Sequence, residues 1–156
     1  MVRNCFPRDG IRSLFLTPAE SYGLPEVARL TNTLPRKLRR EVSAGNRDAS
    51  KVRGLWRFTW RQAVCTAMQR WTLAEIHEAL GDDAVAVLPP LLALRAVTVR
   101  LPEFIVRALE TVAAENGTTL DAALHGELID FAGTLSGQMD RHIPGYREAY
   151  MFPDRA

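Results

Sequence analysis

The sequence contains little cysteine and histidine. Its two cysteines are Cys5 and Cys65, and its three histidines are His77, His125 and His142. They do not have the spacing of a metal site or a redox motif, so we expect neither a zinc centre nor a disulfide scaffold. The sequence also shows no nucleophile–base pair, no paired carboxylates and no phosphate-binding loop. We therefore expect no enzymatic activity and no cofactor.

Long hydrophobic runs are missing as well. No segment approaches the roughly 18 consecutive apolar residues that indicate a transmembrane helix, and the first residues, MVRNCFPRDG, lack the apolar centre of a signal peptide. Two cysteines in a chain without an export signal are typical of reduced cytoplasmic thiols. With 47% hydrophobic and 24% charged residues, the composition predicts a globular cytoplasmic protein that does not enter a membrane.

The formal net charge is only +2, but the charges are unevenly distributed along the 156 residues. Residues 36–61 include nine basic and two acidic side chains, which gives +7. Residues 101–140 include one basic and seven acidic side chains, which gives −6. This asymmetry predicts that the basic half binds a polyanion and that the acidic half has a different role.

The basic half begins with a pattern of two short helices and a tight turn. It covers residues 22–45, YGLPEVARLTNTLPRKLRREVSAG, and Pro35 suits the first position of the second helix. Leu34, Leu38 and Val42 recur at four-residue steps, which places them on one face of that helix. The other side chains of the second helix are mostly basic: Arg36, Lys37, Arg39, Arg40 and Ser43.

A hairpin and two more helices are expected next. Residues 46–58 contain Gly54 between short β-prone pieces, which predicts a small wing. Two Thr-x-x-Gln/Glu capping boxes follow. They predict one helix over about residues 60–69 and another that ends at Leu80. The basic residues on or beside the wing are Lys51, Arg53, Arg57 and Arg61.

Residues 20–81 resemble the DNA-binding end of MerR-type winged-helix regulators. The residues that carry this resemblance are Glu26-Val27-Ala28, Leu30-Thr31, Pro35, Leu38-Arg39 and Gly45, followed by the two capped helices. The resemblance implies a winged helix-turn-helix whose second helix enters the major groove of double-stranded DNA while the wing holds the phosphate backbone. The implied DNA contacts are Arg36, Lys37, Arg39, Arg40, Ser43, Lys51, Arg53, Arg57 and Arg61.

The sequence departs from that family pattern at two positions. Asn32 stands in the turn where glycine is usual, and Leu34 stands where a Ser or Thr usually caps the recognition helix. The first N–H groups of that helix therefore need another acceptor, either Thr33 or a DNA phosphate. The long coiled coil and effector-binding segment of many such regulators is missing, so the resemblance does not imply metal or drug sensing.

The acidic half begins with a single strand pattern. In AVTVRLPE, residues 96–103, Val97, Val99 and Leu101 alternate with smaller or polar side chains. Pro102 then opens a helical pattern that ends at Asn116-Gly117. A second helix is expected over about residues 119–132. No second strand is evident in the sequence to pair with the first.

Strand, LPE helix, glycine turn and second helix together resemble the ribbon-helix-helix fold of CopG- and Arc-type repressors. In that fold the strand pairs antiparallel with the same strand of a second chain, so the resemblance implies an obligate homodimer. The implied interface residues are Val97, Val99, Leu101, Ile105, Leu109, Val112, Leu124 and Leu128. Family members read DNA bases with the outward side chains of the ribbon, here Thr98 and Arg100. The charge of −6 favours dimerisation as the ribbon's main role, and DNA contact stays open.

The expected fold is therefore mainly α, a winged helix-turn-helix plus a ribbon-helix-helix with an intermolecular antiparallel β-ribbon. The expected function is a sequence-specific, nucleoid-associated transcriptional regulator that binds DNA as a homodimer. One alternative is an antitoxin whose aromatic tail, with Tyr146, Tyr150 and Phe152, binds a toxin or another protein. Another is a phage or plasmid excisionase-like architectural protein. The expected segments are 20–81 for the DNA-binding domain, 82–94 for a Pro-containing linker, 95–133 for the dimerisation domain and 134–156 for the tail.

Overall fold

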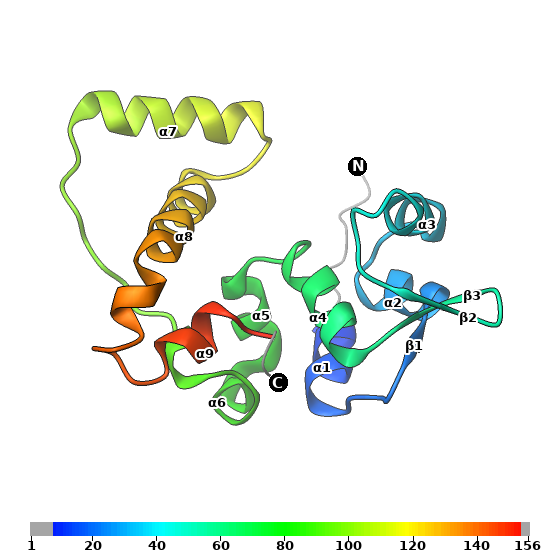
Figure 1. Cartoon of the computed structure of the whole chain (residues 1–156). Helices are drawn as coiled ribbons and strands as arrows, with labels where there is room; N and C mark the ends of the chain where they lie inside the picture. The colour runs from blue at the N-terminus through cyan, green and yellow to red at the C-terminus, as the bar shows by residue number, and fades with distance from the viewer. Residues whose placement is uncertain (1–7, 154–156) are drawn as a thin grey trace. The chain divides into compact units, whose positions relative to one another are not determined.

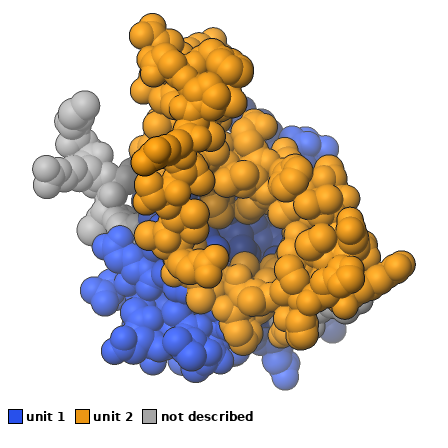
Figure 2. Space-filling view, turned by 90° about the vertical axis from the view of Figure 1, so that its left-hand side faces the viewer, with its two compact units in different colours: residues 1–88, 152–156 blue, residues 89–151 orange. Residues whose placement is uncertain are grey.

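The computed structural model describes residues 8–153 and divides the chain into two compact units (Figure 1). Unit 1 consists of residues 1–88 together with 152–156, and unit 2 consists of residues 89–151 (Figure 2). The structure is mainly helical with a small antiparallel sheet, which confirms the expected fold class at this level. None of the helices within residues 8–153 combines the length and apolar character needed to cross a lipid bilayer.

Two helices joined by a tight turn begin the basic half, as predicted. They are α2 (Leu24–Leu30) and α3 (Pro35–Ser43). Between them Asn32 has a φ of 47°, in the left-handed region that asparagine tolerates better than most residues and that glycine adopts freely. The side chain of Thr31 is fully buried and donates a hydrogen bond of 2.7 Å to the carbonyl of Val27. The turn thus has a buried, hydrogen-bonded hydroxyl at Thr31 and, at Asn32, a residue that tolerates a positive φ.

The predicted hairpin is confirmed and belongs to a three-stranded sheet of order β1-β3-β2. The strands are β1 (Tyr22–Gly23), β2 (Ser50–Val52) and β3 (Leu55–Phe58), and all pairs are antiparallel. Arg53 and Gly54 connect β2 to β3 with φ values of 49° and 81°. Positive φ at both residues is characteristic of the two-residue hairpin turn whose twist matches that of its strands. Strand β1 was not predicted from the sequence.

The two helices after the hairpin start as their capping boxes predicted. In α4 (Trp60–Met68) the hydroxyl of Thr59 accepts from the Gln62 backbone, and the Gln62 side chain accepts from the Thr59 N–H at 2.9 Å. The same reciprocal pair surrounds Thr72 at the start of α5 (Leu73–Leu80). Each box satisfies two N–H groups that a helix start otherwise leaves without an acceptor.

Helical structure continues into the segment expected to be a linker. A short 3-10 turn, η1 (Gly81–Asp83), leads into α6 (Ala84–Val87). A second 3-10 turn, η2 (Pro90–Leu92), opens unit 2. The boundary between the units therefore falls at the first of the two adjacent prolines, Pro89.

Helix α1 (Arg8–Leu16) was not predicted from the sequence, and it packs against α2, α4 and α5. Its apolar side chains Ile11, Leu14 and Phe15 are buried. The guanidinium of Arg12 donates to the carbonyl of Leu80 at 2.9 Å and also contacts the carboxylate of Asp83, so it closes the C-terminal end of α5. Helix α1 thus joins α2 to α4 and α5, the helices that follow the hairpin.

Three aromatic rings complete the core of unit 1, and one of them comes from the far end of the chain. Phe15, Trp60 and Phe152 lie with ring centroids 6.4 Å apart in each pair. The indole N–H of Trp60 also donates to the carbonyl of Leu14 at 2.8 Å. Phe152, expected in a separate tail, is therefore part of unit 1.

Unit 2 contains two long helices and a short third one: α7 (Glu103–Glu115), α8 (Leu120–Met139) and α9 (Tyr146–Tyr150). Helix α7 begins and ends where the sequence predicted, with Gly117 at a φ of 61° in the turn that follows. Helix α8 begins as predicted but runs well past residue 132, into the segment expected to be a tail.

Helix α9 packs on α8 through its tyrosines. The hydroxyl of Tyr146 donates to the carbonyl of Ala132 at 2.9 Å, and its ring stacks on that of Tyr150. A Cβ at Gly133 would lie 2.5 Å from the hydroxyl oxygen of Tyr150, so the absent side chain makes room for this ring. The expected tail is thus partly helical, and its residues 134–151 belong to unit 2.

We predict that Gly10→Ala destabilises unit 1. A Cβ at this position would lie 2.5 Å from the carbonyl oxygen of Leu30, a backbone atom that cannot rotate away. Overpacking of this kind costs about 1–3 kcal/mol of unfolding free energy, although alanine itself favours the helix. Urea unfolding followed by tryptophan fluorescence measures the effect. Ser13→Ala, on the exposed side of the same helix, is the control and should not destabilise. Equal stabilities of the two variants would contradict the prediction.

We also predict that Phe152→Ala weakens unit 1, because it removes one of three mutually packed rings. Phe152 is only half-buried, so the expected loss is about 2 kcal/mol rather than the 3–5 kcal/mol of a fully buried ring. The same fluorescence measurement applies. Phe104→Ala serves as the control, because the Phe104 side chain is 74% exposed. If both variants match the unaltered chain, Phe152 contributes nothing to unit 1.

Candidate nucleic-acid interface

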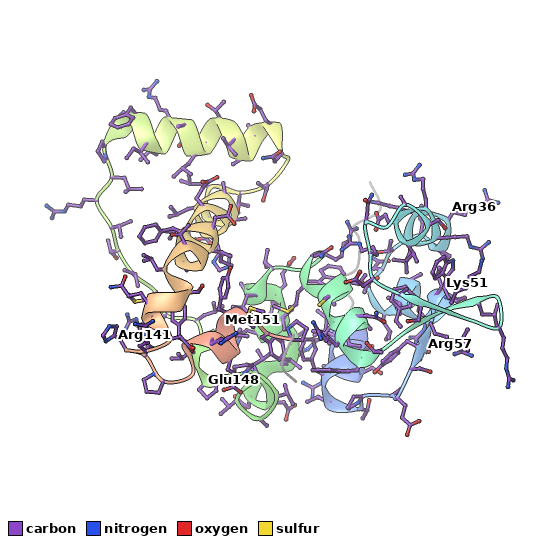
Figure 3. All side chains as sticks on the ribbon, viewed as in Figure 1. Arg36, Lys51, Arg57, Arg141, Glu148 and Met151 are labelled. Carbon is purple, nitrogen blue, oxygen red and sulfur yellow. The ribbon has the colours of Figure 1, made fainter. Side chains whose placement is uncertain are left out.

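The side chains predicted to contact DNA are all exposed on unit 1, and we call them the basic surface. Five come from α3, three from the hairpin and one from the start of α4. Figure 3 shows Arg36 on α3 and Lys51 and Arg57 on the hairpin extending away from the ribbon. The members of the basic surface are Arg36, Lys37, Arg39, Arg40, Ser43, Lys51, Arg53, Arg57 and Arg61.

Helix α3 has one buried side and one charged side. Leu38 is 0% exposed and Val42 is 5% exposed, so these two side chains fix the helix on unit 1. The four basic side chains of α3 are exposed, and no ion pair with another residue of the range 8–153 neutralises them. A rigidly held helix with unneutralised positive charge is suited to bind a polyanion.

One basic residue of this half has an internal role instead. The Arg47 Nε lies 3.0 Å from the Glu41 carboxylate, and the two side chains are only 19% and 20% exposed. This partly buried ion pair ties the loop after α3 back onto the helix. The charge of Arg47 is therefore matched within unit 1 by that of Glu41.

The hairpin tip combines an unusual backbone with exposed apolar side chains. Arg53 has a positive φ of 49°, which few residues other than glycine, asparagine and aspartate adopt. On either side of the turn, Val52 is 51% and Leu55 is 64% exposed. Behind the tip, the Lys51 ammonium lies 5.6 Å from the ring centroid of Trp56, its cross-strand partner. The sequence predicted the basic residues of the wing but not its exposed apolar side chains.

The start of α3 differs from the sequence prediction. The four-residue repeat placed Leu34 on the same face as Leu38, but the Leu34 side chain is 75% exposed. The reason is that Leu34 is the N-cap residue, with an extended ψ of 129°, so its side chain does not follow the helical repeat. Thr33 does not replace the missing cap either, because its hydroxyl pairs with Thr31. No side chain caps α3.

Unit 2 exposes many hydrophobic side chains. Ala113 is the one hydrophobic residue that is buried among the described residues of this unit, at 4% exposure. Of the predicted dimer interface, Ile105, Leu109 and Leu124 are half-buried and the others are exposed. We call the exposed hydrophobic residues the apolar surface of unit 2: Leu91, Leu94, Val97, Val99, Leu101, Phe104, Val112, Leu120, Leu128, Ile129, Phe131, Ile143 and Tyr150.

The segment expected to form a β-ribbon has neither helix nor strand structure within the described chain. Both sets of alternating side chains are exposed: Val97 and Val99 at 68% and 56%, and Thr98 and Arg100 on the alternate positions. Among residues 8–153 no strand pairs with this segment, and its apolar side chains are exposed. β pairing with another chain would cover both the backbone groups and the apolar side chains of this segment.

No group of three or more His, Cys, Asp or Glu side chains in the range 8–153 is arranged to hold a metal ion. The described residues have a basic surface on unit 1 and exposed hydrophobic side chains on unit 2. Comparisons with protein-family models, with curated proteins and with solved structures found no match to this chain.

Proposed function

We propose that this chain is a sequence-specific DNA-binding transcriptional regulator that acts as a homodimer. The observation that carries the proposal is α3, a helix anchored by two buried side chains, whose exposed basic residues have no ion-pair partner among residues 8–153. Such a helix, preceded by α2 and a tight turn, has the form of a recognition helix. The chain would act on the nucleoid in the cytoplasm.

In this proposal α3 enters the major groove, whose width admits one α-helix. Arg39 and Arg40 reach base edges and phosphates, and Arg36 and Lys37 extend the contact along the groove. The hairpin follows the backbone with Lys51, Arg53 and Arg57, and Arg61 adds a contact from α4. Because the phosphate contacts release counterions, the affinity should fall steeply with salt concentration.

The second copy covers the apolar surface of unit 2. The segment around Val97 and Val99 pairs antiparallel with the same segment of the partner, which satisfies the backbone groups of both. The exposed side chains of α7 and α8 then form a shared core. A unit with a single buried hydrophobic residue has too little core to be stable alone, and this supports association as part of its folding.

The alternative of an antitoxin requires a tail whose aromatic side chains are available to a partner protein. Tyr146 and Tyr150 pack on α8, and Phe152 packs in unit 1. These contacts favour a structural role for the tail, so we retain the regulator as the proposed function. No contact within the described residues specifically favours a DNA-bending architectural protein.

We predict that Arg39→Ala and Arg40→Ala each strongly weaken specific DNA binding while the chain stays folded and dimeric. The probe is a set of genomic DNA fragments selected by the unaltered chain, and fluorescence anisotropy measures the affinity. Loss of a bidentate base contact costs about 1–3 kcal/mol, which is a loss of roughly tenfold to a hundredfold. Arg70→Ala is the matched control, because Arg70 is exposed but lies outside the basic surface. Unchanged affinity in both variants would exclude α3 as the recognition helix.

We predict that Val99→Lys converts the homodimer into a monomer, because it places a charge in the centre of the shared core. Light scattering after size-exclusion chromatography measures the mass. Thr98→Lys is the control: the adjacent side chain points to the opposite face of a ribbon, so this variant should remain dimeric. A dimeric Val99→Lys variant, or a monomeric unaltered chain, would contradict the ribbon pairing.

A further inference from the structure

Leu34 has an unusual position for a large hydrophobic residue. It is the N-cap of α3, its side chain is 75% exposed, and Arg36 and Lys37 follow it at the surface. A serine or threonine here would accept a hydrogen bond from the first turn, whereas leucine leaves α3 without a side-chain cap. With leucine at this position, α3 lacks the stabilisation of a capping hydrogen bond, and an apolar side chain is exposed to solvent.

The fold of unit 1 does not explain this residue. Leu38 and Val42 fill the buried side of α3, and the extended backbone of Leu34 directs its own side chain away from them. Pro35, Arg36 and Lys37 follow Leu34 at the surface, and no other large exposed hydrophobic residue lies on α3, so α3 itself carries no larger apolar patch of the kind that binds another protein. Together, Leu34 and the basic side chains beside it would match a partner that is highly charged overall and yet presents a small apolar group.

Double-stranded DNA has this combination. Its phosphates attract the basic surface, and the C5-methyl group of thymine is the apolar group that its major groove presents. Residues at the N-terminal end of a recognition helix are the ones that contact base edges. We propose that Leu34 packs against a thymine methyl group and makes the chain select thymine at one position of each half-site. This inference rests on the proposed function and adds to it a determinant of specificity.

The test compares thymine with uracil, which lacks only the methyl group. Each thymine of a selected DNA fragment is replaced in turn by deoxyuridine, and the affinity of the full chain is measured by fluorescence anisotropy. We expect one position per half-site at which the replacement weakens binding about fourfold, the value of one buried methyl group. Leu34→Ala should show the same loss on unmodified DNA and no further loss on the uracil fragment, because the two changes remove one contact.

Two further variants separate this contact from effects on folding. Leu34→Ser restores a capping hydroxyl, so it should raise the melting temperature of unit 1 while it abolishes the preference for thymine over uracil. Val85→Ala shortens a side chain of unit 1 that is 90% exposed but lies on α6, and it should keep the full preference.

The outcomes distinguish this inference from the proposed function. If Leu34→Ala binds specific DNA and retains the same penalty for uracil as the unaltered chain, Leu34 does not read thymine, although the chain is a DNA-binding protein. The same conclusion follows if no thymine methyl affects the affinity of the unaltered chain. If the full chain selects no DNA fragments at all, both the proposed function and the inference are overturned.

Discussion

Unit 1 depends on the close approach of α1 to the end of α2, which is possible because residue 10 has no side chain. The position that a Cβ would take at Gly10 lies 2.5 Å from the carbonyl oxygen of Leu30. At this distance the apolar side of α1 packs on α2, α4 and α5 at once. The helix-turn-helix and the capped helices are therefore held by one shared element, and the support of the basic surface depends on it.

The two units differ in the size of their hydrophobic core. Unit 1 buries side chains from every one of its longer helices, whereas unit 2 buries Ala113. For the homodimer that we propose, unit 1 is stable by itself, whereas the stability of unit 2 depends on the concentration of the protomer. In the proposed homodimer, dilution would therefore remove the structure of unit 2 before that of unit 1.

Local signals in the sequence predicted much of the fold, and long-range contacts account for what was missed. The capping boxes at Thr59 and Thr72 and the hairpin glycine Gly54 act within a few residues, so the sequence alone reveals them. Helix α1 has an apolar stripe that could have been found, but β1 exists only because Tyr22 pairs with distant Phe58. The four-residue repeat also predicted the wrong face for the Leu34 side chain, since such a repeat describes residues inside a helix and not its N-cap. The resemblances to MerR-type and ribbon-helix-helix regulators remain expectations.

The ring of Phe152 has a consequence for the order in which the protein is made. Unit 1 receives its third aromatic ring from a residue that follows all of unit 2 in the chain. During synthesis the helix-turn-helix leaves the ribosome early, but its core is completed only after residues 89–151 have been translated. A nascent or interrupted chain would carry the basic residues of α3 on a less stable support. Unit 1 therefore reaches its full stability only in chains that also contain unit 2 and Phe152.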